Sequence, residues 1–396
     1  MPSGADLIFV ALFCILAFTS LSVRLLGDAS IGWHIRIGQQ ILSTHAIPRV
    51  DSFSSTMAGQ PWFAWEWLYD VVAGELEAAL GLNGIVWLTA AAIATVFAWT
   101  FRLLIARGAN LLVALVLVLL AVSASMIHFL ARPHVFSWLF TLAWFVVLDS
   151  SERNRSAGVK RLWFLPATML VWVNVHGGFL IGFVLLAIFF VGAAWIWFTT
   201  QENRIEQSLQ KIAAGNRARN LLWVGLASIA ASLVNPYGWK LYRHIYSYLT
   251  NRFLMDHIDE FQSPNFHGVA QKCFLLLLLI TLAVLARRGR ELPMSAVLTA
   301  LFAVYAGLYA SRNIPVSSLL LVLIVGPLTP APEFIRRFSQ RMTAIEVGLR
   351  GHVWPSLVIV ATLAIAANCA RVGSTRLMDA HFDPTRMPVD AVNYLQ

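Results

Sequence analysis

The chain has 396 residues, of which 58% are hydrophobic and only 12% are charged, and its mean hydropathy is +0.70. Soluble domains carry about 25% charged residues, so this composition excludes an ordinary soluble protein. The net charge of +9 does not indicate nucleic-acid binding, because the Lys and Arg residues gather in alternate gaps between apolar runs, as in oriented membrane proteins.

The apolar runs predict an all-α, integral membrane helical bundle of about 11 transmembrane helices. A spanning helix needs about 20 apolar residues, and only helices satisfy their own backbone in lipid without the alternation of barrel strands. We expect one or two of the three shortest runs to be tilted, broken or re-entrant. The predicted spans are 6–26, 83–105, 109–130, 134–149, 162–175, 178–199, 221–234, 269–286, 293–311, 314–332 and 353–370.

Charge asymmetry predicts the orientation of the bundle. The gaps on the N-terminal side contain most of the clustered Lys and Arg residues, which favours a cytoplasmic N-terminus in a bacterial inner membrane and a periplasmic C-terminus. Residues 6–26 lack a basic leader region and a clear cleavage signal, so they are interpreted as an uncleaved first span. The basic clusters are 153–161, 204–219, 287–290 and 336–350.

Two outer loops are predicted to contain surface helices. In the loop 27–82, Ser30–Ser43 and Trp62–Leu80 look helical, and the loop is rich in Trp and Tyr, which favour the headgroup region. Aromatic residues recur near period 3.5 in a second segment, about 239–261, which predicts an interfacial amphipathic helix. A helix packed against the bundle explains the same pattern equally well.

The domain prediction is a bundle over 1–371 and a polar outer segment over 372–396, which we expect to be the start of a further periplasmic domain cut off at Gln396. Cys14, Cys273 and Cys369 lie in apolar stretches at unrelated spacings, so neither a disulfide framework nor a zinc site is indicated. No histidine pair has the i, i+4 spacing of helix metal ligands. No cofactor is predicted, and a divalent metal stays an open alternative.

Short polar clusters occupy every second gap, and alternate gaps lie on the same side of a membrane. The candidate chemistry is therefore expected on one outer face. The clusters are Asp28 to Glu66, Arg132-Pro133-His134, Asn174 to Gly178, Asn235 to Gly238 and Arg312 to Pro315.

Three acids in the first outer loop are candidates. Asp28, directly after the first span, is the first choice for a catalytic residue, although a helix cap also explains it. Asp51 is a candidate substrate ligand or the closing residue of an Asx turn. Glu66 lies between two Trp residues, where burial would raise its pKa and suit it to proton transfer; the alternative is a solvated helix acid.

The remaining candidates are cations and amides. Arg132 and Arg312 each begin a short outer turn, and a guanidinium fork fits phosphate oxygens, although snorkelling Arg is the common alternative. The predicted substrate-binding residues beside them are His134, Asn174, His176 and Asn313. The Asn235-Pro236-Tyr237-Gly238 cluster is interpreted as a structural turn.

These motifs resemble a group of largely uncharacterised bacterial multi-span proteins that look like GT-C-type glycosyltransferases. The similarity is carried by Asp28 to Gly38, Pro48 to Ser54, Gly59 to Trp62 and Glu66 to Leu68, together with the clusters above. It implies transfer of a sugar from a polyprenyl-phosphate carrier on the outer face, with an aspartate of the first outer loop as base. Asp28 matches that position, whereas Ala29 stands where many such enzymes have a second acid.

The resulting hypothesis is an inner-membrane glycosyltransferase with a polyprenyl-phosphate sugar and membrane lipids as its partners. Two rivals are a non-catalytic scaffold and a lipid or solute transporter. A scaffold predicts that Asp28, Arg132 and Arg312 are dispersed, whereas a transferase predicts that they converge on one cavity. Ion-coupled transport is disfavoured because the spans contain few charged residues. The sugar, the acceptor and the oligomeric state are not indicated.

Overall fold

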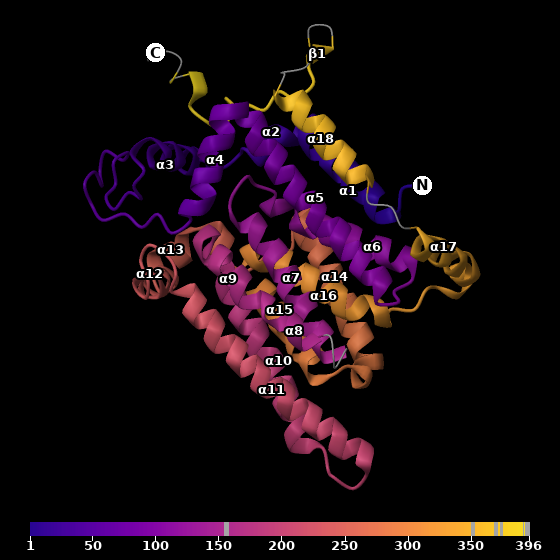
Figure 1. Cartoon of the computed structure of the whole chain (residues 1–396). Coiled ribbons are helices and arrows are strands. Elements are labelled where there is room, and N and C mark those ends of the chain that lie inside the picture. Colours follow the sequence, from indigo (N-terminus) through magenta and orange to yellow (C-terminus); the bar gives the residue numbers. More distant parts are fainter. Residues whose placement is uncertain (154–157, 350–352, 368–370, 373–374, 391, 393–396) are drawn as a thin grey trace.

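In the computed structural model, the described residues are 1–153, 158–349, 353–367, 371–372, 375–390 and 392, and they are almost entirely helical (Figure 1). The longer helices are α1 Gly4–Phe18, α3 Ser30–Thr44, α4 Trp67–Leu80, α5 Leu82–Ala106, α6 Leu111–Ser125, α7 His134–Arg153, α9 Phe164–Val175, α10 Leu180–Thr199, α11 Ile205–Ser232, α12 Lys240–Leu249, α14 Val269–Arg288, α15 Met294–Tyr309, α16 Ile314–Val325, α17 Arg336–Gly348 and α18 Val353–Ala367.

Short elements connect them. These are α2 Leu21–Leu25, α8 Gly158–Leu162 and α13 Arg252–His257, the 3-10 turns η1 Met126–His128, η2 Gly177–Phe179, η3 Asp259–Phe261, η4 Gly289–Glu291, η5 Ser311–Asn313, η6 Gly326–Leu328 and η7 Glu333–Ile335, and the antiparallel two-residue strands β1 Arg371–Val372 and β2 Thr375–Arg376.

The chain is a helical membrane protein. Within the described ranges, six helical segments are long and apolar enough to cross a bilayer, and the bent pair α17 and α18 would make a seventh. Helices α1 and α15 are apolar but shorter. The predicted count of eleven spans therefore stays a prediction. The six segments are Leu82–Ala106, Leu111–His128, His134–Arg153, Gly177–Thr199, Val269–Glu291 and Ser311–Leu328.

Two predicted spans differ from the structure. The run 6–26, predicted as one span, is not one continuous helix, because α1 ends at Phe18 and α2 begins at Leu21. Thr19 explains the break: its hydroxyl donates to the carbonyl of Ile15 and accepts the N–H of Leu21. The run 162–175 forms α9, whose 12 residues extend about 18 Å, too short to cross a bilayer upright.

Helix α16 is the centre of the bundle. All of its residues from Ile314 to Val325 are buried, and it contacts α5, α6, α7, α14 and α15. A helix that is apolar all round is stable only when other helices surround it. Because η5 leads directly into α16, the fold holds Arg312 and Asn313 at a fixed position at one end of the bundle.

Helices α3 and α4 pack backbone to backbone at that same end (Figure 1). The contact depends on two glycines. A Cβ at Gly38 would lie 1.8 Å from the carbonyl oxygen of Asp70, and a Cβ at Gly74 would lie 2.7 Å from the backbone of Gly38 and Gln39. The absence of side chains at both positions lets α3 and α4 approach closely, which fixes the distance between the residues they carry.

We predict that Gly38→Ala destabilises the protein by about 1–3 kcal/mol, because the added methyl group forces α3 away from α4. Thermal unfolding in detergent micelles, followed by circular dichroism, measures the effect. Gly32→Ala is the matched control, since Gly32 lies on the same helix and a Cβ there meets nothing within 4 Å. Equal melting temperatures for the two variants would contradict the close-packing explanation.

The single interfacial helix predicted over about 239–261 is also wrong in part. The segment divides into α12, α13 and η3, and Asn251 caps the second helix by accepting the N–H of Leu254. Leu241 and Ile245 are buried, whereas Tyr246 and Phe253 are about 70% exposed. One face of α12 therefore packs on the bundle, as the alternative interpretation expects, and the location of the exposed face at a membrane interface stays a prediction.

The segment after α18 is described only in part. Asn83, at the start of α5, donates to the carbonyl of Met378 and accepts the N–H of Ala380, which holds this segment against the bundle. Cys14 and Cys273 are free thiols, and Cys369 lies outside the described residues.

Candidate functional site

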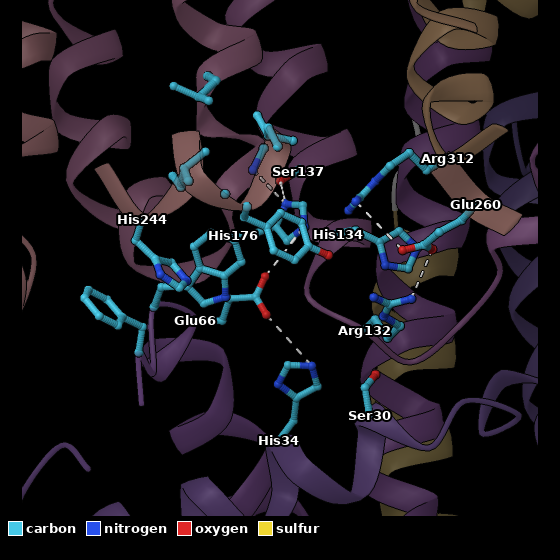
Figure 2. Close-up of a pocket in the computed structure, with 18 of the residues that line it drawn as sticks. Ser30, His34, Glu66, Arg132, His134, Ser137, His176, His244, Glu260 and Arg312 are labelled. Carbon is cyan, nitrogen blue, oxygen red and sulfur yellow. Dashed lines mark hydrogen bonds and ion pairs between the residues drawn. The ribbon is translucent and has the colours of Figure 1, made fainter. Parts of the chain in front are cut away.

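A cavity of about 900 Å³ lies where the polar gaps meet, at the end of the bundle that α3 and α4 cover. Its walls come from the first outer loop, α3, α4, α7, η2, α12, η3 and η5 (Figure 2). The polar and charged lining residues are Ser30, His34, Asp51, Gln60, Glu66, Asp70, His128, Arg132, His134, Ser137, His176, His244, Tyr248, Glu260, Tyr309, Arg312 and Asn313. Residues from four of the five predicted polar clusters line this cavity, and the membrane face to which it opens stays a prediction.

Glu66 lies between two imidazoles in this cavity (Figure 2). One carboxylate oxygen is 3.6 Å from Nε2 of His176, and the other is 4.0 Å from Nε2 of His34. The other ring nitrogen of His34 contacts the carboxylate of Asp70 at 2.6 Å. Asp70 and His34 therefore form a hydrogen-bonded pair, and the second ring nitrogen of His34 faces Glu66 at ion-pair distance.

His176 has a defined tautomer. Its Nδ1 accepts the backbone N–H of Gly178 at 2.9 Å, so the remaining proton of the neutral ring lies on Nε2, which faces Glu66. Ser137 also contacts Nδ1, and a Cβ at Gly178 would lie 2.6 Å from the Ser137 hydroxyl. Burial, followed by the charges of Arg312 and Arg132, holds the pKa of His176 well below its usual range.

Burial raises the pKa of Glu66 from 4.5 to about 7, and the nearby charge of His34 only partly opposes this shift. Burial by itself lowers the pKa of His34, because it disfavours the charged imidazolium. The hydrogen bond and the charge of Asp70 outweigh this effect and raise the pKa of His34 above 6.5. A carboxyl group with a pKa near 7 can both accept and donate a proton at neutral pH. The Glu66 side chain is 15% exposed, so the structure favours the buried interpretation over a solvated helix acid.

The raised pKa of Glu66 predicts how the stability of the folded protein depends on pH. The folded protein binds a proton on Glu66 more tightly than the unfolded chain, so the contribution of Glu66 to stability is largest below pH 4.5 and decreases as the pH rises toward about 7. Shifting a pKa from 4.5 to about 7 corresponds to about 3 kcal/mol. Glu66→Gln should therefore stabilise the protein by up to that amount at pH 8 and have little effect at pH 4.5.

Denaturant unfolding in mixed micelles at both pH values measures the difference. Glu75→Gln, on the exposed side of α4, is the matched control and should change little at either pH. An equal effect of Glu66→Gln at pH 4.5 and pH 8 would contradict the proton linkage.

Two arginines and two acids form the second part of the site. Nη1 of Arg132 is 3.3 Å from Asp28 and 3.3 Å from Glu260, and Nη1 of Arg312 is 3.8 Å from the other oxygen of Glu260. The guanidinium of Arg312 also stacks on the ring of Phe261 at 4.6 Å. The structure thus links three polar gaps that are far apart in the sequence.

Asp28, the predicted catalytic residue, lies beside this cluster and is not among the residues that line the cavity. It accepts the N–H of Ser30 at 2.7 Å at the start of α3 and pairs with Arg132. Burial pushes its pKa upward, but hydrogen bonding by Ser30 and the charge of Arg132 bring the pKa of Asp28 below its usual value. Its catalytic role stays a prediction, and Glu66 has the better position.

Two predicted substrate ligands, Asp51 and His134, line the cavity but already form hydrogen bonds with other residues of the protein. Asp51 accepts the N–H groups of Phe53 and Ser54, so it closes the Asx turn that was the structural alternative. Nε2 of His134 contacts the carbonyl of His128 at 2.9 Å.

The two predicted asparagines are also engaged. Asn313 lines the cavity and donates to the carbonyl of Ala306. Asn174 is buried away from the lining, where it donates to the carbonyls of Leu170 and Val234 and accepts from Trp67. This position disfavours a substrate-binding role for Asn174.

Sequence analysis missed three residues of the site, Asp70, Ser137 and Glu260, and also the pairing of His34 with Asp70. Asp70 lies four residues after Glu66, the residue that precedes α4, and this i, i+4 spacing in the predicted helix Trp62–Leu80 was an available signal. Ser137 lay inside a predicted span, and Glu260 lay in the predicted interfacial segment. Neither position carries a local pattern that distinguishes it.

Aromatic side chains form the apolar walls. Trp33 and Trp62 stack with ring centroids 5.6 Å apart, and Phe63 stacks on His244 at 4.3 Å. The Tyr237 hydroxyl accepts the N–H of Ala64, which joins the Asn235–Gly238 turn to the first outer loop. That turn has the structural role predicted for it.

The fold and the site define a helical membrane protein with a buried ionisable cavity at one end of its bundle. Among the residues described, no group of three or more His, Cys, Asp or Glu side chains has the arrangement of a metal site. The sequence matches no protein-family model and no curated protein.

Proposed function

We propose that this protein is a membrane-embedded glycosyltransferase that moves a sugar from a polyprenyl-phosphate carrier to an acceptor hydroxyl. One observation carries the proposal: Glu66, with a pKa of about 7, shares a single cavity with two arginines. A proton acceptor next to a pair of anion-binding groups is the combination that glycosyl transfer from a phosphate requires.

Glu66 is the proposed base. As the acceptor oxygen attacks the anomeric carbon of the sugar, its proton passes to the Glu66 carboxylate, and the bond between that carbon and the phosphate oxygen breaks. The phosphate leaves with the electron pair. His34 and Asp70 hold the position and charge of Glu66, and the Nε2–H of His176 faces its other oxygen.

Arg132 and Arg312 are the proposed phosphate ligands. Charge grows on the leaving phosphate in the transition state, and preorganised guanidinium groups stabilise it most effectively where little water is present. Their side chains are 24% and 26% exposed, so the cavity partly shields them from water. This convergence supports a transferase over a scaffold, which needs no such cluster.

The finer assignments belong to the same proposal. The bundle is GT-C-like with eleven spans, it lies in a bacterial inner membrane with a cytoplasmic N-terminus, and the cavity and C-terminus face the periplasm. The stacked Trp33 and Trp62 offer a surface for a sugar ring or a lipid chain. No cofactor is required by this reaction scheme.

Reconstitution in lipid nanodiscs tests the proposal. Purified protein is mixed with isoprenyl-phosphate sugars that carry a labelled hexose or pentose and with a panel of hydroxyl acceptors. We expect release of isoprenyl phosphate together with a labelled product, detected by mass spectrometry. Hydrolysis or transfer that is equally fast with Glu66→Gln protein would contradict the proposed site.

A further inference from the structure

Glu260 occupies the position between the two arginines that the proposed function assigns to phosphate (Figure 2). Oε2 lies 3.3 Å from Nη1 of Arg132, and Oε1 lies 3.8 Å from Nη1 of Arg312. A single carboxylate thus connects both guanidinium groups, one oxygen to each. Two oxygens of a phosphate group would make the same kind of bridge.

The charges of this cluster already balance. Arg132 and Arg312 are positive, and Glu260 and Asp28 are negative and contact them directly. An incoming phosphate therefore meets no net positive charge while both carboxylates stay in place. Strong binding requires one of the two acids to leave its arginine, because like charges at this distance repel each other.

Asp28 is the fixed acid of the two. It caps the first turn of α3 through the N–H of Ser30 at 2.7 Å, in addition to its contact with Arg132. Glu260 lies on the three-residue turn η3, and among the described residues its carboxylate forms ion pairs with the two arginines alone. Rotation of its side chain is enough to free both guanidinium groups.

The backbone around Glu260 stays anchored during such a rotation. The neighbouring Phe261 is buried beneath the guanidinium of Arg312, and the carbonyl of Gln262 accepts the N–H of Ser311 at 2.9 Å. Nε2 of His128 is buried in the same lining without a hydrogen-bond partner among the described residues.

We infer that Glu260 is an internal competitor for the anion site: its carboxylate neutralises Arg132 and Arg312 in the empty protein and is displaced by the phosphate of the substrate. This inference rests on the proposed phosphate site. It makes Glu260 an affinity-determining residue and not a proton carrier. The same competition weakens the hold on the phosphate product, which helps that product to leave after transfer.

Binding to Glu260→Gln protein tests the inference without any need for turnover. The full chain in detergent is titrated with geranyl phosphate, a short isoprenyl monophosphate, and separately with inorganic phosphate, by isothermal calorimetry. Removing the competing charge should tighten binding at least about tenfold. If Glu260→Gln binds both probes more tightly, the carboxylate of Glu260 competes with the phosphate group itself. If only geranyl phosphate binds more tightly, the site selects a phosphate that is attached to a lipid chain.

Asp259→Asn is the matched control, because Asp259 is an exposed acid on the same turn that contacts neither arginine in the described structure. It should bind both probes as the unmodified protein does. If Glu260→Gln binds no tighter than Asp259→Asn, or more weakly, Glu260 positions the arginines and the inference is overturned, while the phosphate site stands. If neither the unmodified protein nor either variant binds a probe, the proposed phosphate site is wrong as well.

Discussion

Glu66→Gln is expected to lower the rate of sugar transfer by about 10²–10⁴-fold, the usual contribution of a general base. Glutamine keeps the size of the side chain but accepts no proton from the acceptor. The pH profile provides a second signature. Since Glu66 acts in its unprotonated form and its pKa is about 7, the rate of the unmodified protein should fall about tenfold per pH unit below that value and level off above it.

The measurement is the initial transfer rate from pH 5 to pH 9 in nanodiscs. The residual activity of Glu66→Gln should no longer decrease below pH 7, whereas Glu75→Gln should keep the rate and the pH profile of the unmodified protein. If Glu66→Gln is slower but its rate still decreases below pH 7, another group accepts the proton.

Asp28→Asn tests the residue that the sequence predicted to be catalytic. If this variant loses activity but its rate still decreases below pH 7, Asp28 has a positioning role.

Arg312→Gln is expected to lower the transfer rate by about 10²–10³-fold, because it removes a group that stabilises charge on the leaving phosphate. Substitution of Arg312 tests the phosphate contact more directly than substitution of Arg132. Removal of Arg132 also leaves Asp28 without its ion pair, which would mix a stability effect with the catalytic one. Arg312→Lys should recover only part of the rate, since an ammonium lacks the planar fork of donors.

Single-turnover rates with a bound isoprenyl-phosphate sugar separate the chemical step from binding. Arg243→Gln is the control, because Arg243 is an exposed cation on α12 that does not line the cavity. If Arg312→Gln and Arg243→Gln have equal single-turnover rates, Arg312 contributes only to the general potential of this face, and the proposed phosphate contact is wrong.

The elements that sequence analysis located best are those set by local patterns. Helix α3 begins at the predicted Ser30 and ends one residue beyond the predicted Ser43. Helix α4 ends at the predicted Leu80 but begins five residues after the predicted Trp62. Periodicity marks a helix interior, whereas its first turn depends on contacts such as those of the preceding loop with Tyr237, which no local pattern reveals.

The residues of the site divide in the same way. Arg132, His176 and Arg312 were candidates because polar residues in outer gaps are unusual in so apolar a chain. Asp28 was preferred to Glu66 on its place after the first span, and the structure gives Glu66 the buried position. Burial depends on the close approach of α3 and α4, which Gly38 and Gly74 allow. Their importance could not be recognised before the two helices were seen in contact.

By itself, the sequence determined that this is a helical membrane protein and that its polar gaps meet on one side. Both follow from composition and from the alternation of gaps across a bilayer, which are properties of the chain read locally. Only the tertiary structure decided which polar groups touch: Glu66 with His176, and Arg132 with both Asp28 and Glu260. These pairs are separated by more than 100 residues, and helix packing alone sets their distances.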